Sequence, residues 1–167
     1  MKFITLVRHA KAARPSGTDD FDRPLNARGQ AEARETGAVM AAHGIAPDIA
    51  LCSPSRRTRE TLDLILPSLS GAMESLFEEG LYVASADDIL KRIRDLPDAF
   101  AHVLFVGHNP AMHALALDLA DAANDPGALS DLRSNFGTGA LAQFEFDAWR
   151  WKDVRAGCGS LLHFVEP

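Results

Sequence analysis

The sequence is poor in cysteine and has no long hydrophobic run. Among its 167 residues, Cys52 and Cys158 are the only cysteines. Two cysteines are too few for a disulfide framework, and this pair lacks the CxxC spacing of a metal site. The apolar run within the first seven residues is ended by Arg8 and is shorter than a signal peptide requires. Because no run approaches the ~20 apolar residues of a membrane span, we expect a cytoplasmic protein with free thiols and no membrane partner.

An excess of positive charge is also missing. The chain has 17 Lys and Arg against 23 Asp and Glu, which gives a net charge of −6. A surface with this balance should not attract nucleic acid, so we expect no nucleic-acid partner. A local basic pocket is still compatible with this total. Length and composition are ordinary for a globular protein, with 47% apolar and 24% charged residues, so we expect a single domain over residues 1–167.

Predicted strands alternate with predicted helices along the chain. The apolar, β-branched pattern predicts strands at residues 2–7, 49–52, 102–106, 140–146 and 161–165. Helices are predicted at 27–43, with an apolar face of Ala38, Val39, Ala42 and Ile45, at 87–95, and after the cap-and-proline pairs Ser53-Pro54 and Asn109-Pro110. Residues 121–137 are expected to be mostly loop. This order favours an α/β fold, a sheet covered by helices on both faces, and the late pair of strands favours a mixed sheet.

Three predicted strands are each followed by residues that can carry chemistry. Arg8-His9, Ser53-Pro54 and Gly107-His108 stand at carboxyl ends, where open α/β sheets bind their ligands. Arg57 lies in the first turn of a predicted helix, where the helix dipole favours a phosphate. Two imidazoles and two guanidiniums around one dianionic group form a phosphoryl-transfer site with a histidine nucleophile.

Each of these residues also has an ordinary explanation. His9 alone could be a hydrogen-bonded histidine at a strand end, and Arg57 alone could pair with a carboxylate; it is the joint pattern that favours a site. A metal site is not predicted, because His108 and His113 are five residues apart and miss the spacing of a helical metal-binding pair. No cofactor is predicted either.

The segments that follow the strands resemble the motifs of a known family. Arg8-His9-Ala10 resembles the Arg-His-Gly signature of the histidine phosphatase superfamily, the phosphoglycerate mutase-like group, with Ala in place of Gly. Residues 53–61 resemble its Ser-Pro-x-x-Arg-x-x-x-Thr segment, and residues 106–110 its second-histidine segment. Together with residues 22–26 and 137–140, the similarity is nearest to the SixA-like phosphohistidine phosphatases, and it extends to about Phe146.

This resemblance implies a three-layer α/β/α sandwich with a mostly parallel, mixed sheet, phosphoglycerate mutase-like in fold. It implies a metal-independent phosphatase in which His9 becomes phosphorylated while Arg8, Arg57 and His108 hold the phosphoryl oxygens. The loop around Thr138 and Gly139 could add backbone donors for phosphate. Larger relatives use a carboxylate as general acid, for which the candidates are Glu78 and Glu79.

The substrate expected from this resemblance is a protein that carries phosphohistidine. Two alternatives remain open at the level of sequence. One is a phosphatase that acts on small phosphorylated metabolites, the phosphate monoesters. The other is a phospho-binding module without turnover, although such a module would need cations more than a nucleophile such as His9. The sequence makes no prediction about oligomeric state.

Overall fold

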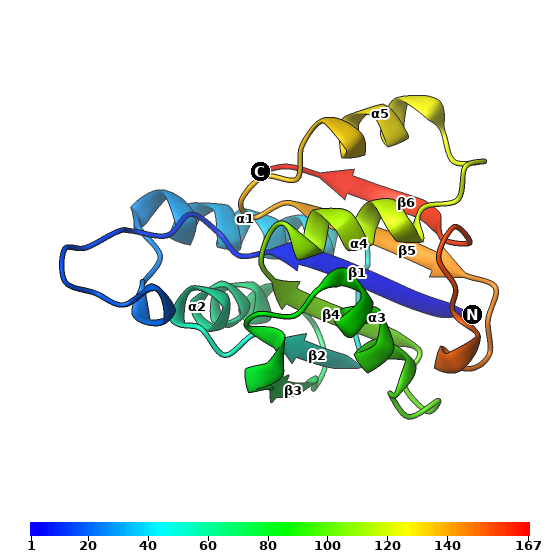
Figure 1. Ribbon diagram of the computed structural model, residues 1–167, viewed down its shortest axis with the longest axis horizontal. Coiled ribbons are helices and arrows are strands. Elements are labelled where there is room, and N and C mark those ends of the chain that lie inside the picture. Colours follow the sequence, from blue (N-terminus) through cyan, green and yellow to red (C-terminus); the bar gives the residue numbers. More distant parts are fainter.

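A six-stranded sheet runs through the middle of the molecule (Figure 1). The computed structural model describes all residues, 1–167. The strands are β1 (Lys2–Arg8), β2 (Ile49–Cys52), β3 (Glu74–Phe77), β4 (His102–Gly107), β5 (Leu141–Phe146) and β6 (Ser160–Val165). The α-helices are α1 (Ala27–Ala42), α2 (Arg56–Ile65), α3 (Ala86–Arg94), α4 (Ala111–Leu119) and α5 (Pro126–Ser134). Four short 3₁₀ helices complete the list: η1 (Asp20–Asp22), η2 (Leu66–Ser68), η3 (Glu79–Leu81) and η4 (Trp151–Asp153).

The strand order brings together the carboxyl ends of the three strands that lead into candidate site residues. The order is β3-β2-β4-β1-β5-β6. The pairs β2–β3, β2–β4 and β1–β4 are parallel, whereas β5 is antiparallel to both of its neighbours. The predicted mostly parallel, mixed sheet is therefore confirmed. Since β2, β4 and β1 are adjacent and parallel, their carboxyl ends lie side by side, next to the loop that follows β1 (Figure 1).

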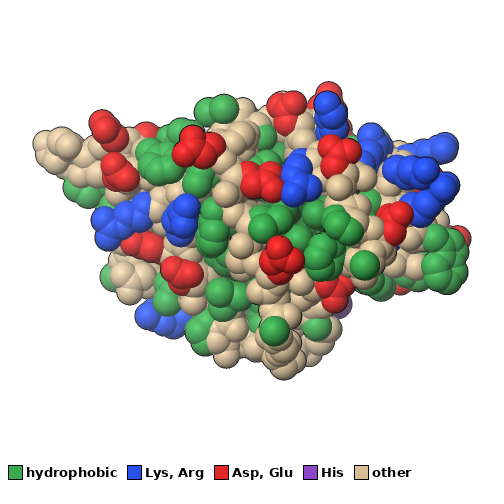
Figure 2. Space-filling model, turned by 90° about the horizontal axis from the view of Figure 1, so that it is seen from below, with side chains coloured by type: hydrophobic (Ala, Val, Ile, Leu, Met, Phe, Trp, Pro, Cys, Tyr) green, Lys and Arg blue, Asp and Glu red, His purple; other side chains and the backbone are tan.

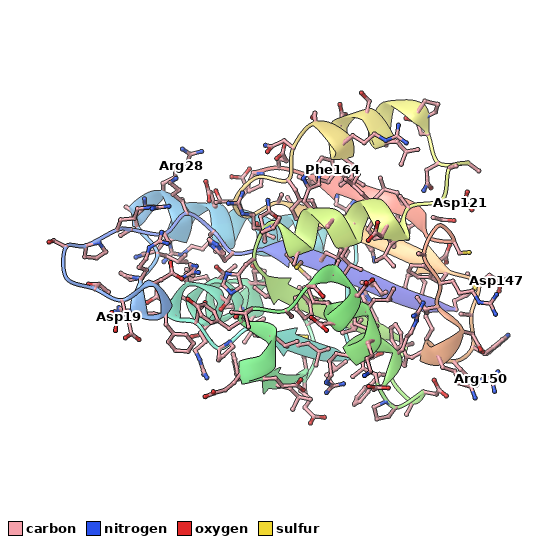
Figure 3. All side chains as sticks on the ribbon, viewed as in Figure 1. Asp19, Arg28, Asp121, Asp147, Arg150 and Phe164 are labelled. Carbon is pink, nitrogen blue, oxygen red and sulfur yellow. The ribbon has the colours of Figure 1, made fainter.

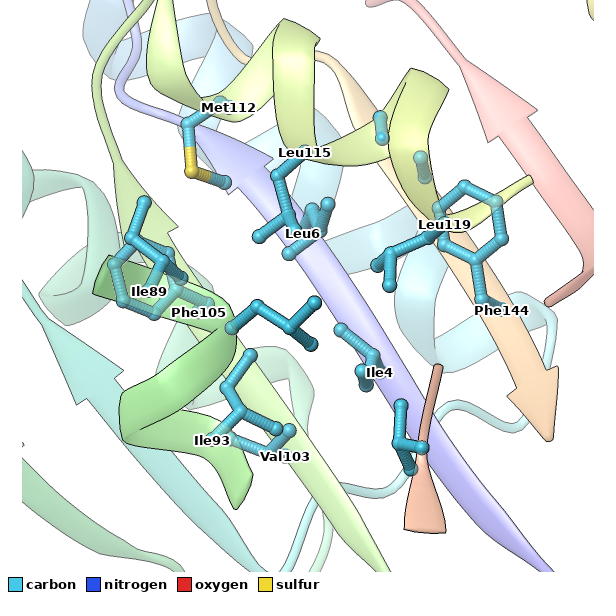
Figure 4. Packing of buried hydrophobic residues seen from close by; sticks show 14 of the residues in the cluster. Ile4, Leu6, Ile89, Ile93, Val103, Phe105, Met112, Leu115, Leu119 and Phe144 are labelled. Carbon is cyan, nitrogen blue, oxygen red and sulfur yellow. The ribbon is translucent and has the colours of Figure 1, made fainter. Parts of the chain in front are cut away.

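Successive residues of the central strands face opposite layers of helix. Ile4 and Leu6 of β1 belong to a core cluster with residues of α3 and α4, whose packing over the sheet is shown in Figure 4. Val7 belongs to the second cluster, with residues of α1 and α2. This alternation is the period of two of a β-strand, and it buries both faces of the sheet. The predicted three-layer sandwich is confirmed.

Two elements were not predicted, and both bury little apolar surface. The edge strand β3 has no fully buried residue. Helix α5 lies inside the segment expected to be loop and buries only Leu129 and Leu132. Its N-terminus follows the rules for a cap, because the Asp125 carboxylate accepts a hydrogen bond from the Ala128 amide at 2.9 Å and Pro126 opens the first turn. The sequence therefore contains the capping residues of this helix, but it has too few apolar residues at helical spacing to predict the helix itself.

The buried face of α1 differs from the predicted one. Ala38 and Ala42 are exposed, and the buried residues are Gly29, Glu32, Ala33, Thr36, Gly37 and Met40. A methyl group added at Gly37 would approach the Ile65 carbonyl oxygen of α2 to 3.0 Å. The two helices therefore pack closely through small residues, which hydrophobic periodicity does not detect.

Both predicted cap-and-proline starts lie slightly before the real helices. Helix α2 begins at Arg56 with Ser55 as its N-cap, and α4 begins at Ala111 with Pro110 as its N-cap. Neither Ser53 nor Asn109 caps a helix. Their side chains bond instead to the ring of His108 and to the Phe136 carbonyl oxygen. Both residues are thereby committed to the region of the candidate site.

The surface carries mixed charge. On the face shown in Figure 2, acidic and basic side chains are interspersed with hydrophobic ones. None of the helices is long and apolar enough to cross a bilayer. Asp19, in the loop after β1, lies at one end of the molecule, and Asp147 and Arg150 lie at the other (Figure 3).

Candidate active site

Backbone hydrogen bonds between neighbouring strands fix the floor of the site. The amide of His9 donates to the Gly107 carbonyl oxygen at 3.0 Å, and the amide of Ser53 donates to the Val106 carbonyl oxygen at 3.1 Å. The carboxyl ends of β1, β2 and β4 are thus joined one residue beyond their ladders. The motif segments that follow β1, β2 and β4 are far apart in the sequence, but they are neighbours in the folded chain.

A pocket of about 350 Å³ opens above these strand ends. The four side chains singled out from the sequence, Arg8, His9, Arg57 and His108, all line it. Its lining also includes the following residues: Lys11, Ala12, Arg14, Asp20, Arg23, Tyr82, Val83, Asn109 and Thr138. Five of the lining side chains are cationic and one is a carboxylate. In a protein of net charge −6, such a pocket is a local site for an anion.

The ring of His9 is held in one tautomer. Its Nδ1 lies 2.8 Å from the Ala10 carbonyl oxygen. Because a carbonyl oxygen only accepts hydrogen bonds, Nδ1 carries the proton of the neutral ring. The other nitrogen, Nε2, then keeps its lone pair. A histidine in this state has a nucleophilic atom available at the end of β1.

Burial also keeps His9 neutral. The pKa of His9 is lowered to about 3, mainly by burial and also by the nearby His108, Arg57 and Arg8, although the bond to Ala10 acts in the opposite direction. The ordinary pKa of histidine is about 6.5. His9 is therefore unprotonated at neutral pH, as an attacking imidazole must be.

Unpartnered buried polar atoms gather at this pocket. The buried side-chain nitrogen and oxygen atoms that find no hydrogen-bond partner in the protein are Arg8 Nε, Arg57 Nε and Asn109 Oδ1. All three belong to residues that line the pocket. A buried donor without a partner costs about 1–3 kcal/mol, so its retention favours a ligand that supplies the partner.

His108 is neutral and committed to two neighbours. Burial lowers the pKa of His108 to about 4, with Arg57 as the next largest cause. Its Nδ1 lies 3.4 Å from an Arg57 nitrogen and its Nε2 lies 2.7 Å from Ser53 Oγ. Since an arginine only donates, Nδ1 accepts and Nε2–H donates to the serine. The rings of His9 and His108 are 5.3 Å apart between centroids.

Asp20 is a site residue that sequence reasoning missed. Its carboxylate accepts hydrogen bonds from Arg57 at 3.0 Å, from Arg23 at 2.9 Å and from the Tyr82 hydroxyl. The bonds from Tyr82 and Arg23 and the nearby Arg57 hold the pKa of Asp20 well below its usual range. The long polar loop after β1 was the available signal, since long loops in compact domains are often functional.

The structure separates the remaining predicted residues. Thr138 lines the pocket, but Gly139 does not. The Gly139 amide donates to the carbonyl oxygens of Arg8 and His9, at 3.1 and 3.2 Å, so it is not free for a phosphate. Its φ of +72° explains why a glycine stands there. The prediction that Gly139 binds phosphate is therefore corrected: it ties down the end of β1.

The two candidate general acids lie outside the pocket. Glu78 forms a bidentate ion pair with Arg92, with oxygen–nitrogen distances of 2.9 and 2.7 Å. Neither Glu78 nor Glu79 lines the pocket. The structure therefore does not support either as an acid at this site, because a catalytic acid must reach the leaving group. No cluster of three or more His, Cys, Asp or Glu side chains that could hold a metal ion is present.

Two further motif positions, Thr61 and Ala10, have structural roles beside the pocket. The Thr61 hydroxyl accepts a hydrogen bond from the Ala10 amide at 3.0 Å and donates to the Arg57 carbonyl oxygen at 2.7 Å. It therefore couples the chain after His9 to the helix that carries Arg57. The side chain of Ala10, where the motif has glycine, is fully buried in a small apolar cluster with Leu25.

The titration of His9 provides a direct test of this geometry. We expect the His9 ring to stay neutral as the pH of the ligand-free protein falls from 7 to about 4.5, because its pKa lies near 3. The unfolded chain takes up this proton near pH 6.5, so the folding free energy contributed by His9 should decline as pH falls below that value. The measurement is imidazole nitrogen chemical shift against pH, with the signal assigned by its loss in His9→Ala. A titration midpoint near 6.5 would contradict the assigned environment.

Comparison with known proteins agrees with this arrangement. Residues 4–82 match the family described as histidine phosphatase superfamily (branch 1). An uncharacterised protein of Mycobacterium tuberculosis is 35% identical over 163 residues, covering 96% of this chain and 99% of its own.

Two solved structures are similar to this protein over nearly its whole chain. A protein of Nakamurella multipartitia assigned as phosphohistidine phosphatase SixA is 29% identical, with a TM-score of 0.86 over 99% of this chain and 96% of its own. A protein of Agrobacterium tumefaciens with the same assignment is also 29% identical, with a TM-score of 0.83 over 99% of this chain and 98% of its own. This protein therefore belongs to the SixA-like branch of the histidine phosphatase superfamily and is a phosphatase.

Proposed function

We propose that this phosphatase removes the phosphoryl group from phosphohistidine on another protein, through a covalent phosphohistidine at His9 and without a metal or cofactor. The whole chain, residues 1–167, would act as one catalytic domain. The observation that carries the proposal is the neutral His9, with a free Nε2, in a pocket lined by five cationic side chains. Those cations supply the positive charge that a metal ion provides in other phosphatases.

The first half of the reaction transfers the phosphoryl group to the enzyme. Nε2 of His9 attacks the phosphorus atom while the bond from phosphorus to the substrate nitrogen breaks, and the bonding electron pair leaves with the substrate imidazole. Arg8 and Arg57 contact the equatorial oxygens, where the charge of the transition state is spread. Both side chains line the pocket, and their Nε–H groups have no partner in the protein. In the second half, water attacks the phosphorus atom, inorganic phosphate leaves and His9 returns to its neutral state.

The roles of His108 and Asp20 follow from their charge. A bound dianion favours the protonated form of a neighbouring histidine, so phosphate raises the pKa of His108 and Nδ1 becomes a donor to it. Asp20 is ionised, because its hydrogen bonds lower its pKa. An ionised carboxylate is unable to protonate a leaving group, and its lowered pKa also makes Asp20 a weak base, so its role would be to orient Arg57 and the water that hydrolyses the intermediate.

The choice of phosphohistidine as substrate rests on the leaving group. Asp20 is the one carboxylate in the pocket, and Tyr82, whose pKa is raised by its bond to Asp20, is a poor proton donor. An alkoxide needs a positioned acid, whose contribution is typically ~10²–10⁴-fold. The imidazole of phosphohistidine leaves more readily and picks up its proton from water. The assignment of the Nakamurella and Agrobacterium proteins as phosphohistidine phosphatases supports the same substrate.

Substrate preference is the experiment that tests the proposal. We expect kcat/KM for a protein phosphorylated on histidine to exceed that for sugar and glycerate phosphates by at least ~10²-fold, the lower end of the effect of a general acid. The measurement compares these substrates side by side under the same conditions, with phosphate release as the readout. A small ester that is preferred tenfold or more would favour a metabolite phosphatase instead. Stoichiometric binding of phosphate without release from any substrate would favour a binding module.

A further inference from the structure

An apolar groove continues directly from the phosphate pocket. It has a volume of about 450 Å³ and shares Tyr82, Val83, His108 and Asn109 with that pocket. Beyond the shared residues, its lining is Ala84, Ser85, Ala86, Pro110, Ala111 and Ala114. These residues come from the segment that leads into α3 and from the first half of α4, two helices that pack on the same face of the sheet (Figure 1).

The ring of Tyr82 lines both the pocket and the groove. It meets the ring of His108 edge to face, at 5.5 Å between centroids, and meets Phe21 in the same way at 5.1 Å. The next residue, Val83, is 83% exposed, which is unusual for a valine. An apolar side chain that water surrounds at the rim of an active site is available for contact with the molecule that enters it.

The chemistry of the groove specifies an apolar occupant. None of its lining residues is Asp, Glu, Lys or Arg, in contrast to the five cations of the neighbouring pocket. A charged group placed in the groove would lose water without gaining an opposite charge. Four of its ten lining residues are alanine, which leaves space for side chains of another molecule to approach the backbone. Because the groove and the pocket are continuous, the occupant belongs to the molecule that presents the phosphoryl group.

We propose that this groove binds apolar side chains that flank the phosphorylated histidine on the substrate protein, and thereby sets which phosphoproteins are accepted. The inference rests on the proposed function, since it assigns a recognition surface to that same site. Phosphate would be held by the cationic pocket in every substrate. The groove would distinguish one phosphohistidine protein from another by the residues next to the phosphate.

Peptides phosphorylated on a single histidine by phosphoramidate provide the test. Two peptides differ only in the neighbours of that histidine, leucine in one and serine in the other. We expect the unaltered protein to show a KM about tenfold lower for the leucine peptide, in line with partial burial of one leucine side chain. Ala114→Glu introduces a charge into the groove at an exposed residue that does not line the phosphate pocket. We expect this variant to lose the preference and to hydrolyse the serine peptide at the normal rate.

The matched control is Ala38→Glu. Ala38 is also an exposed helical alanine, but it lies on α1, which covers the other face of the sheet. This variant should keep the preference for leucine. Equal KM values for the two peptides with the unaltered protein, or a preference that survives Ala114→Glu, would overturn the groove assignment alone. Failure of the unaltered protein to hydrolyse either peptide would overturn the proposed function as well.

Discussion

Replacement of His9 by alanine is expected to lower kcat by at least ~10³-fold, because it removes the covalent nucleophile while the cations that bind phosphate remain. His9 is the nucleophile candidate with a free ring nitrogen, since its Nδ1 is committed to the Ala10 carbonyl oxygen and its neighbour His108 uses both ring nitrogens. The substitution removes one side-chain hydrogen bond from the fold. The measurement is steady-state phosphate release, with thermal unfolding to show that the variant is folded.

Two further observations make this result specific. His43→Ala, at an exposed histidine that does not line the pocket, should leave the rate within about twofold. Rapid acid-free quenching of the unaltered protein during turnover should trap a phosphoryl group that is labile in acid and stable in base, as a phosphoramidate is, and His9→Ala should trap none. An alanine variant that keeps more than a tenth of the normal rate would exclude the covalent mechanism.

Replacement of Arg57 by alanine is expected to lower kcat/KM by ~10²–10³-fold, the usual effect of losing one preorganised donor to a transition state. The side chain of Arg57 is 7% exposed, its Nε has no partner in the protein, and it lines the pocket. Arg57→Lys should recover part of the loss, because lysine keeps the charge but not the planar fork that binds two oxygens. The measurement is kcat/KM for one phosphohistidine peptide.

The adjacent Arg56 is the natural control for Arg57. Its side chain is 57% exposed and pairs with Glu60 at 2.7 Å, an arrangement worth about 0.3–0.5 kcal/mol on a helix. Glu60 also accepts a hydrogen bond from the Leu25 amide at 2.7 Å, which does not depend on Arg56. We therefore expect Arg56→Ala to change kcat/KM by less than about threefold. Equal defects in the two alanine variants would mean that the effect comes from the helix and not from the phosphate contact.

The four residues predicted for the site line one pocket, and three of them could be grouped from the sequence because they end or directly follow a strand. Arg8, His9 and His108 stand at the carboxyl ends of strands. In a parallel sheet these ends all lie on the same side, so such residues come close together. The same argument from strand ends did not identify a general acid. Glu78 and Glu79 follow the edge strand β3, which the sequence did not reveal, and Glu78 is occupied by an arginine fourteen residues further along the chain.

The fold-level predictions succeeded where apolar residues repeat regularly. Helix α4 buries Met112, Leu115, Ala116 and Leu119, which recur at the spacing of one helical face. Helix α1 was found at the right position, but its buried face is made of small and polar residues that pack against α2. Close packing through glycine depends on the distance between two helices, and no single helix sequence contains that distance.

What the sequence determined by itself is the order of elements and the identity of the residues that end the strands, because strand periodicity and polar residues at strand ends are local properties. Only the tertiary structure decided the surroundings of those residues. The free Nε2 of His9 depends on a carbonyl oxygen at 2.8 Å, and its lowered pKa depends on burial and on His108, from a strand almost one hundred residues away. Asp20 reaches Arg57 because a loop folds back across the strand ends. Nucleophilicity, charge state and access are properties of distances between segments, and those distances exist only once the chain is folded.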